Sequence, residues 1–134
     1  MTHPSKQKGN RFERLCVDKA QSYGVAAERA WGSNGRSLGM HEEVDVLLEG
    51  EVRIQAKCRK KIAKWLKPSV FVDAVTVKEN HGDTYILMRY DDFLEEYKKY
   101  LQLKKVVGKD VEKLLDRKEQ EESLWNYVGN VKKR

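Results

Sequence analysis

The chain has 134 residues, of which 36% are charged and 40% hydrophobic, and its net charge is +6. This length suits one ordinary domain with its own core, and no run of residues approaches the roughly 20 apolar positions of a membrane span. The N-terminal residues MTHPSKQKGN lack the apolar segment of a signal peptide. We therefore expect a cytoplasmic protein that does not enter a membrane.

The first helix is predicted from Asn10 to about Tyr23, because apolar residues recur there at helical spacing and Gly24 supplies a stop. Residues 1–7 are expected to form a disordered tail, and residues 25–30 suit a short edge strand. The next segment, WGSNGRSLGMHEE (residues 31–43), is too polar and too rich in glycine to be regular. A loop of this length in a small domain is usually functional or mobile.

Two apolar runs flank Glu49-Gly50-Glu51 and predict a β-hairpin over residues 44–58. The following KKIAKWLK predicts a short helix that Pro68 ends. Residues 71–78 and 84–90 are rich in β-branched and aromatic side chains and predict a second hairpin.

The last third of the chain is expected to be helical. Asp91 and Asp92 are acids suited to a helix N-terminus, so a helix is predicted to open there and to break at Gly108. A final amphipathic helix is predicted from about Asp110 to Tyr127. The order of elements predicts an α/β protein with a mixed β-sheet and helices outside it.

Positive charge is concentrated in the first half of the chain. Residues 1–69 hold 14 Lys and Arg against 8 Asp and Glu, whereas residues 70–134 hold 13 of each. The segment from residue 57 to residue 67 has no acid and six bases: Lys57, Arg59, Lys60, Lys61, Lys64 and Lys67. Because each phosphate contact releases counterions, such a patch favours nucleic-acid binding over the alternative of a solvated basic face.

Three polar residues interrupt the apolar runs of the first hairpin: Asp45 in the first, Gln55 and Lys57 in the second. Since strand side chains alternate between faces, Gln55 and Lys57 share one face. A three-residue loop makes paired positions sum to 100, so that Asp45 opposes Gln55 and Glu43 opposes Lys57. A two-residue loop would set Asp45 against Ile54 and send the polar groups to opposite faces. Gly50 permits either turn, and the sequence leaves both open.

A carboxylate, an amide oxygen and a lysine on one face are the groups that metal-assisted phosphoryl chemistry needs. Mg²⁺ prefers oxygen ligands and is commonly held by one or two protein carboxylates together with substrate phosphates. The ion polarises a phosphoryl oxygen and activates a water molecule. A nearby ammonium group orients that water, accepts its proton or stabilises charge on the phosphate.

Asp45 followed by Gln55-Ala56-Lys57 resembles the motif of the PD-(D/E)xK nuclease superfamily. Within that superfamily, an ordered set of features is similar to archaeal-type Holliday junction resolvases and their phage-encoded relatives. The set comprises KGNRFE at residues 8–13, the loop WGSNGRS, the hairpin, and CRKK after it. Each motif alone is weak, whereas the ordered set is more specific.

The resemblance covers about residues 8–103 and implies a restriction-endonuclease-like domain, with residues 104–134 as a C-terminal helical extension. It implies that Glu13 and Asp45 are metal ligands, together with the Gln55 side chain and the Ala56 carbonyl. Lys57 would act on the attacking water. The implied metal is Mg²⁺, with Mn²⁺ able to substitute.

Further roles follow from the same resemblance. Ser33 lies where the resolvases place a serine near the scissile phosphate, and Ser37 is a rival for that assignment. Several bases would grip the DNA backbone: Lys8, Arg11, Arg36, Arg59, Lys60, Lys61 and Lys64. The substrate would be a four-way DNA junction cut by paired nicks, and two symmetric cuts imply a homodimer.

One residue departs from the family pattern, because the family usually has glutamate where Gln55 stands. Glutamine offers an oxygen without charge, so metal affinity should be lower. Mrr-like members of the superfamily carry the same Q-x-K. Glu43, which flanks Lys57 if the loop has three residues, is a candidate source of the missing charge.

Several alternatives stay open at the level of sequence. Glu13 follows Asn10 by three residues and so fits the far half of a capping box. Asp45 fits a solvent-facing edge strand, although its apolar neighbours favour a central strand and a partnered carboxylate. The chain also fits a nuclease of the same fold with a restriction or repair substrate, a catalytically inactive DNA-binding relative, or a basic binding module whose motif is accidental.

Overall fold

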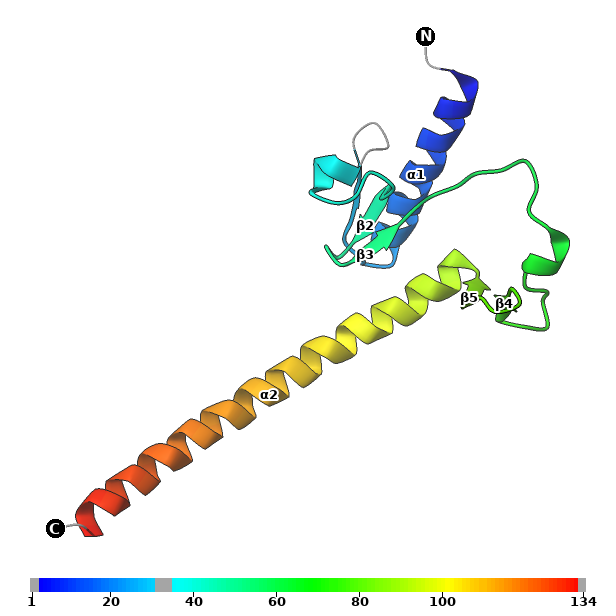
Figure 1. The fold of residues 1–134 in the computed structure, drawn as a ribbon. Helices are drawn as coiled ribbons and strands as arrows, with labels where there is room; N and C mark the ends of the chain where they lie inside the picture. Colours follow the sequence, from blue (N-terminus) through cyan, green and yellow to red (C-terminus); the bar gives the residue numbers. More distant parts are fainter. Residues whose placement is uncertain (1–2, 31–34, 133–134) are drawn as a thin grey trace. The chain divides into compact units, whose positions relative to one another are not determined.

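The computed structural model describes residues 3–30 and 35–132, and the side chains of residues 3–30 and 35–123. The chain divides into two compact units, residues 1–98 and residues 99–134. The described part of the first unit contains helix α1, five strands and the beginning of helix α2, and the described part of the second is the remainder of α2 (Figure 1). None of the described helices combines the length and apolarity that crossing a membrane requires.

Helix α1 (Pro4–Ser22) begins six residues before the predicted start. The Nδ1 atom of His3 accepts a hydrogen bond from the N–H of Ser5 at 3.2 Å, and Pro4 suits the first helical position because its φ is already helical. Residues 4–7, expected in a disordered tail, therefore form the first turn of this helix. Asn10 lies inside the helix, so Glu13 is not the far half of a capping box.

Helix α1 ends at Ser22, just before Gly24, as the sequence predicts. Gly24 has a φ of +78°, and its N–H donates to the carbonyl of Gln21 at 2.9 Å. The N–H of Val25 donates to the carbonyl of Ala20 at 3.0 Å. These two bonds satisfy carbonyls that the end of a helix leaves without intrahelical partners.

The first sheet is antiparallel in the order β1-β2-β3, with β1 at Ala27–Arg29, β2 at Val46–Leu48 and β3 at Val52–Ile54. Val46 pairs with Ile54, and Leu48 pairs with Val52, so paired positions sum to 100. The three-residue loop is therefore the correct alternative. Glu49 and Gly50 both have positive φ, at 51° and 68°, and a hydrogen bond from Glu51 N–H to Leu48 O closes the turn at 2.9 Å.

Strand β2 lies at the centre of the core. Every residue from Val44 to Leu48 is buried, which the nearly continuous apolar run predicts for a central strand. Helix α1 contacts both β1 and β2 and buries Cys16 and Ala20. Strand β1 pairs only with β2 among the described strands, so its predicted place at the edge is confirmed.

The second sheet is the predicted hairpin of β4 (Ala74–Lys78) and β5 (Thr84–Met88), paired antiparallel. The predicted single mixed sheet is wrong for the described residues, because they form two separate sheets in which every pairing is antiparallel. Strand β3 stops at Ile54, and the charged segment that follows contains only a short 3-10 turn, η3 (Lys64–Leu66), instead of the predicted helix. The fold is mixed α/β, and the restriction-endonuclease-like arrangement remains a prediction.

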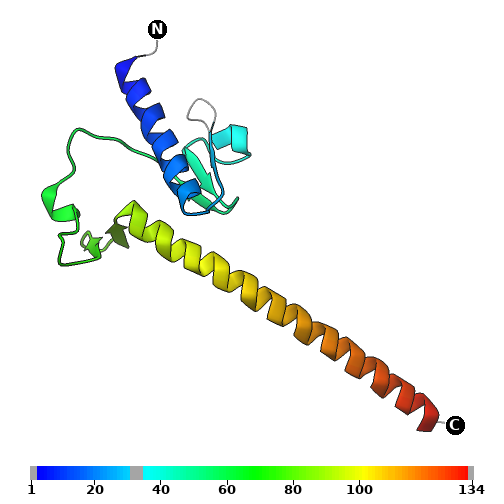
Figure 2. The same ribbon diagram turned by 180° about the vertical axis from the view of Figure 1, so that it is seen from behind.

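Helix α2 (Tyr90–Lys132) is uninterrupted, so the predicted break at Gly108 is wrong (Figures 1 and 2). One glycine inside a helix costs about 1 kcal/mol relative to alanine, which neighbours with good helix propensity offset. Asp91 and Asp92 occupy the first turn as predicted. The boundary between the two units falls after Lys98, inside this helix and five residues before the predicted boundary at 103.

Two glycine substitutions are expected to have opposite effects on the free energy of unfolding. Gly24→Ala forces an alanine into a left-handed conformation and should lower that free energy by about 1–2 kcal/mol. Gly9→Ala lies inside α1, where an added Cβ meets nothing within 4 Å, and should raise it by up to about 1 kcal/mol. Urea unfolding followed by circular dichroism measures both. Equal effects of the two variants would contradict the described end of α1.

Candidate functional site

Asp45 is buried, with 8% of its surface exposed, and its carboxylate is held by the neighbouring strand. Its Oδ2 atom accepts the N–H of Ala56 at 2.8 Å. Its backbone N–H donates to the carbonyl of Ile54 at 2.9 Å, and its carbonyl accepts the N–H of Ala30 at 2.9 Å. The described part of the chain donates no hydrogen bond to Oδ1, so the carboxylate is engaged through one oxygen only.

Glu13 is the other buried acid, with 4% exposed, and it comes from helix α1. Its Oε2 atom lies 3.2 Å from Nη1 of Arg29 in strand β1. Arg29 precedes Ala30, whose N–H donates to the backbone carbonyl of Asp45. The Glu13 carboxylate and the Asp45 backbone therefore attach to adjacent residues of one chain segment. Loss of either member of a buried ion pair leaves an uncompensated charge, which is costly.

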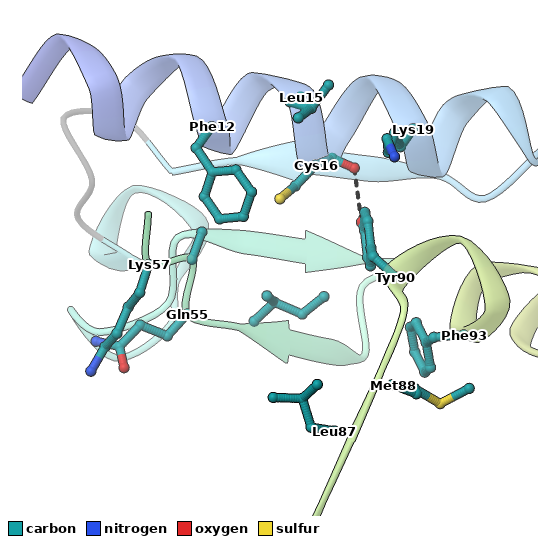
Figure 3. A pocket seen from close by; sticks show the side chains of 12 residues that line it. Phe12, Leu15, Cys16, Lys19, Gln55, Lys57, Leu87, Met88, Tyr90 and Phe93 are labelled. Carbon is teal, nitrogen blue, oxygen red and sulfur yellow. Dashed lines mark hydrogen bonds between the residues drawn. The ribbon is translucent and has the colours of Figure 1, made fainter. Parts of the chain in front are cut away.

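Gln55 and Lys57 lie just beyond β3 and are exposed, while Ile54, Ala56 and Cys58 are half-buried. The predicted alternation of polar and apolar faces is therefore confirmed. Figure 3 shows the Gln55 and Lys57 side chains projecting in the same direction from the segment after β3. The regular pairing ends with Val46 and Ile54, and continuing its register by one position sets Asp45 opposite Gln55.

A cavity of about 550 Å³ lies beside these polar groups within the first unit. Gln55 and Lys57 line it next to a mainly apolar wall formed by Phe12, Leu15, Cys16, Leu87, Met88 and Phe93 (Figure 3). Gln55 also lines a depression of about 320 Å³ together with Glu43. The acid proposed to supply the missing charge therefore borders the same surface hollow as the glutamine.

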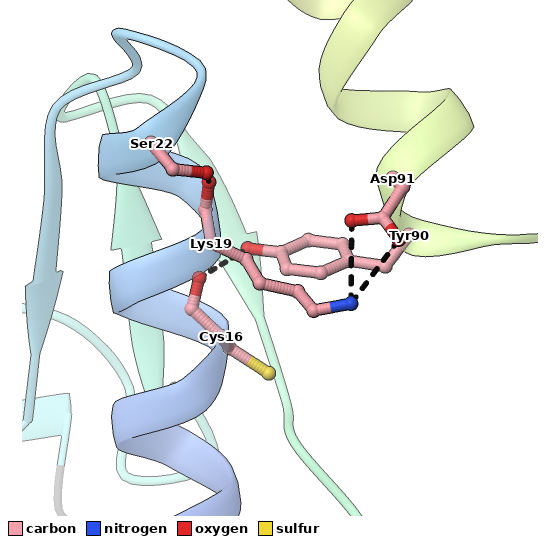
Figure 4. Close-up of polar contacts among 5 residues, drawn as sticks. All are labelled: Cys16, Lys19, Ser22, Tyr90 and Asp91. Atoms are coloured by element: carbon pink, nitrogen blue, oxygen red, sulfur yellow. Dashed lines mark hydrogen bonds and ion pairs between the residues drawn. The ribbon is translucent and has the colours of Figure 1, made fainter.

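Tyr90 and Asp91 connect the first turn of α2 to helix α1 (Figure 4). The Tyr90 hydroxyl donates to the carbonyl of Cys16 at 2.8 Å, and Lys19 Nζ lies 3.1 Å from Asp91 Oδ2. Burial raises the pKa of Tyr90 to about 12, with Cys16 and Asp91 adding to the effect. Burial and the nearby Glu13 also raise the pKa of the Cys16 thiol, although Lys19 opposes them. The thiol is thus a neutral lining group at physiological pH.

The basic run forms a second surface feature, which we call the basic hollow. It has a volume of about 730 Å³ and is lined by Arg59, Lys60, Lys61, Ile62, Ala63, Lys64 and Lys67. All seven side chains are exposed. Five of the seven are cations and none is an acid, so the hollow concentrates positive potential in the way that phosphate binding requires.

The remaining predicted DNA-binding residues are dispersed. Lys8 and Arg11 are exposed on α1, and Arg11 borders a shallow depression with Asn10 and Arg14. Arg36 lies 3.6 Å from Glu42, so its charge is partly balanced. Its neighbour Ser37 is exposed in the short 3-10 turn η2 (Gly35–Leu38).

Ser33, the predicted loop serine, lies outside the described residues. Among the residues that are described, no three His, Cys, Asp or Glu side chains gather as a metal-binding group. The oxygen donors that the sequence predicts for a metal are the Glu13 and Asp45 carboxylates, the Gln55 amide and the Ala56 carbonyl.

Arg29 and Tyr90 are the two residues of this region that the sequence reasoning missed. The sequence could have predicted the position of Arg29, because side chains of a strand alternate between its two faces. Ala27 and Arg29 share the inward face and are half-buried, whereas Glu28 lies on the other face and is exposed. The role of Tyr90 could not be predicted in this way, since its partner is a backbone carbonyl 74 positions away.

Comparison with protein-family models, with curated proteins and with solved structures gives no match to this chain.

The raised pKa of Tyr90 predicts a specific loss of stability in alkali. Between pH 10 and pH 12 the unfolded chain releases the Tyr90 proton while the folded chain retains it, so the free energy of unfolding should fall as the pH rises. Tyr90→Phe should lack this part of the pH dependence. Unfolding in urea at pH 9 and pH 11 measures the effect, with Tyr85→Phe, at an exposed tyrosine, as the matched control. An unchanged pH dependence in Tyr90→Phe would contradict the assigned hydrogen bond.

Proposed function

We propose that this chain is a metal-dependent DNA endonuclease that selects branched DNA and resolves four-way junctions by paired nicks. The observation that carries the proposal is the held carboxylate of Asp45. It is buried, it binds the N–H of the residue between Gln55 and Lys57, and its register opposes Gln55. A buried acid oriented in this way beside an exposed lysine is an arrangement that hydrolysis of a phosphodiester can use.

The donor set fits a hard divalent cation. Asp45 Oδ1, the Gln55 side-chain oxygen and the Ala56 carbonyl would hold Mg²⁺, and Mn²⁺ would be accepted by the same oxygens. When bound, the metal supplies charge stabilisation at the phosphoryl group and a more acidic water. Glu13 is bound to Arg29, so it contributes to the site chiefly by fixing that arginine and the segment that carries Ala30.

Lys57 is the residue we assign to the attacking water. Its side chain projects in the same direction as that of Gln55 (Figure 3), and its ammonium group would orient a water molecule and stabilise negative charge on the phosphate. The basic hollow follows two residues later in the chain and would bind the DNA backbone on each side of the scissile phosphate. Such contacts are independent of base sequence, which suits recognition by shape.

A second candidate is a relative that binds DNA without cutting it. The specific observation in its favour is the charge balance, because Arg29 neutralises Glu13 and Gln55 carries no charge. Asp45 then supplies the only unbalanced buried carboxylate among the described residues, with the exposed Glu43 nearby. A restriction-type or repair-type nuclease of the same fold is the third candidate.

The catalytic assignment predicts loss of cleavage with retained binding. Asp45→Asn and Lys57→Ala should each lower the rate of nicking of a labelled four-way junction by about 10²-fold or more in Mg²⁺. Asp73→Asn and Lys78→Ala, at exposed positions, are the matched controls and should cut normally. Circular dichroism confirms folding, and gel-shift titration in EDTA measures binding.

The outcomes separate the candidates. Paired nicks in the junction alone support the resolvase, and equal cutting of linear duplex supports the third candidate. Binding without cutting in either metal supports the inactive relative. Gln55→Glu should lower the Mg²⁺ concentration that cleavage requires, and an unchanged requirement would remove Gln55 from the ligand set.

The basic hollow predicts a change in the salt dependence of DNA binding. Replacing Lys60, Lys61 and Lys64 by glutamine should reduce the slope of log affinity against log salt by about 0.9 for each duplex phosphate that the variant no longer neutralises. The matched control replaces Lys98, Lys105 and Lys109, three exposed lysines of α2. The net charge of both variants falls equally, so an equal change in slope would show that total charge, and not the hollow, determines binding.

A further inference from the structure

The described part of the second unit is a single helix, and over residues 99–123 most of its apolar side chains face solvent. Leu103, Val107, Val111, Leu114 and Leu115 are between 46% and 63% exposed. Within residues 99–123 every side chain but Leu101 is exposed. A helix in a protein gains most of its stability from packing its apolar face, so we expect this face to pack against a partner.

Four of the exposed apolar residues follow a seven-residue repeat. Tyr100, Val107 and Leu114 recur at intervals of seven, and Val111 lies midway between the last two at a spacing of four and three. Val111, Leu114 and Leu115 border a depression of about 400 Å³. We call the set of Tyr100, Val107, Val111 and Leu114 the α2 stripe. Its spacing is that of a two-helix coiled-coil interface.

Charged residues at the same repeat positions constrain the orientation of a second copy. The repeat places Lys104, Lys118 and Glu121 in the stripe alongside the apolar residues. In a parallel, in-register pair each of these meets its own equivalent, which sets like charges against each other at three levels. An antiparallel pair avoids all three conflicts.

We propose that the α2 stripe pairs with the same stripe of a second copy of this chain, in antiparallel orientation. In the register where facing positions sum to 225, Lys104 faces Glu121 and Val111 faces Leu114 of the second copy. Val107 then meets the aliphatic stem of Lys118, a packing that long cationic side chains support. One register therefore matches apolar with apolar and opposite charge with opposite charge.

Residues flanking the stripe agree with this register. Flanking positions meet at sums two higher or two lower than the stripe positions, because they lie beside the stripe and not in it. On one side Asp110 faces Arg117, with a sum of 227, which gives two symmetric ion pairs. On the other side Gly108 faces Leu115, with a sum of 223. An added Cβ at Gly108 would meet nothing within 4 Å of its own chain, so the surface above this glycine is open to a leucine from outside.

The overall charge of the helix gives an independent argument. Residues 99–109 contain four lysines and no acid, whereas residues 110–123 contain six acids and three bases. Antiparallel pairing sets the positive segment of each copy against the negative segment of the other, and parallel pairing sets like against like. The inference rests on this helix alone and does not depend on the proposed nuclease activity.

Cross-linking of the full chain tests the orientation. In a Cys58→Ser background, which leaves only the buried Cys16, Asp110→Cys and Arg117→Cys are prepared separately and treated with a short bismaleimide. Antiparallel pairing predicts little covalent dimer from either variant alone and abundant dimer from their mixture. Covalent dimer from each variant alone would establish a parallel pair and overturn the proposal.

Mass measurement tests the stripe itself. Light scattering at tens of micromolar should give the wild-type chain twice its mass of 15.6 kDa, and Val111→Glu with Leu114→Glu should reduce it to 15.6 kDa. Glutamate is a better helix former than valine, so circular dichroism should show the helix retained. Val106→Glu, at an exposed valine outside the stripe, is the matched control and should remain dimeric. A monomeric wild-type chain, or an equal effect of Val106→Glu, would overturn the proposal.

Discussion

The hydrogen bond between the Asp45 carboxylate and the Ala56 N–H fixes the two chain segments on which the proposed site depends. It joins Asp45, which directly precedes β2, to Ala56, the residue between Gln55 and Lys57, at 2.8 Å. Because a charged acceptor makes a stronger hydrogen bond than a neutral one, it fixes both the carboxylate and the backbone that presents its neighbours. The same bond takes an N–H that would otherwise be free to pair with a further strand, which fits the end of β3 at Ile54.

The ion pair of Glu13 with Arg29 complements this bond by joining α1 to the first strand. A buried glutamate without a partner would strongly destabilise the domain, and Arg29 removes that cost. The same ion pair would weaken a metal site, because Arg29 already neutralises Glu13, one of the two buried acids. With Gln55 uncharged as well, Asp45 alone would bring about one unit of buried negative charge to the proposed metal site. The charge balance of these residues therefore predicts that the proposed site would bind a cation weakly.

Local patterns predicted the parts of the fold whose partners are near in sequence. Alternation and the Glu49-Gly50-Glu51 loop predicted the hairpin and its two faces, and Gly24 predicted the end of α1, because each depends on contacts within a few residues. The start of α1 was missed because histidine is an unusual N-cap residue. The break predicted at Gly108 was wrong because one unfavourable residue does not end a long helix. The division into two sheets and the partners of Glu13 and Cys16 depend on distant segments, which no local pattern specifies.

Symmetry connects the two proposals although each has its own evidence. An antiparallel helix pair has a twofold axis, which in the assigned register passes between Val111 and Leu114. A dimer formed in this way would also carry two copies of the proposed Asp45 and Lys57 site. A four-way junction offers two equivalent strands about its own twofold, and a monomer with one site must dissociate and rebind to cut both. A chain paired through α2 would bring two sites into one encounter, so the proposed helix pairing would supply the second site that the proposed paired nicking requires.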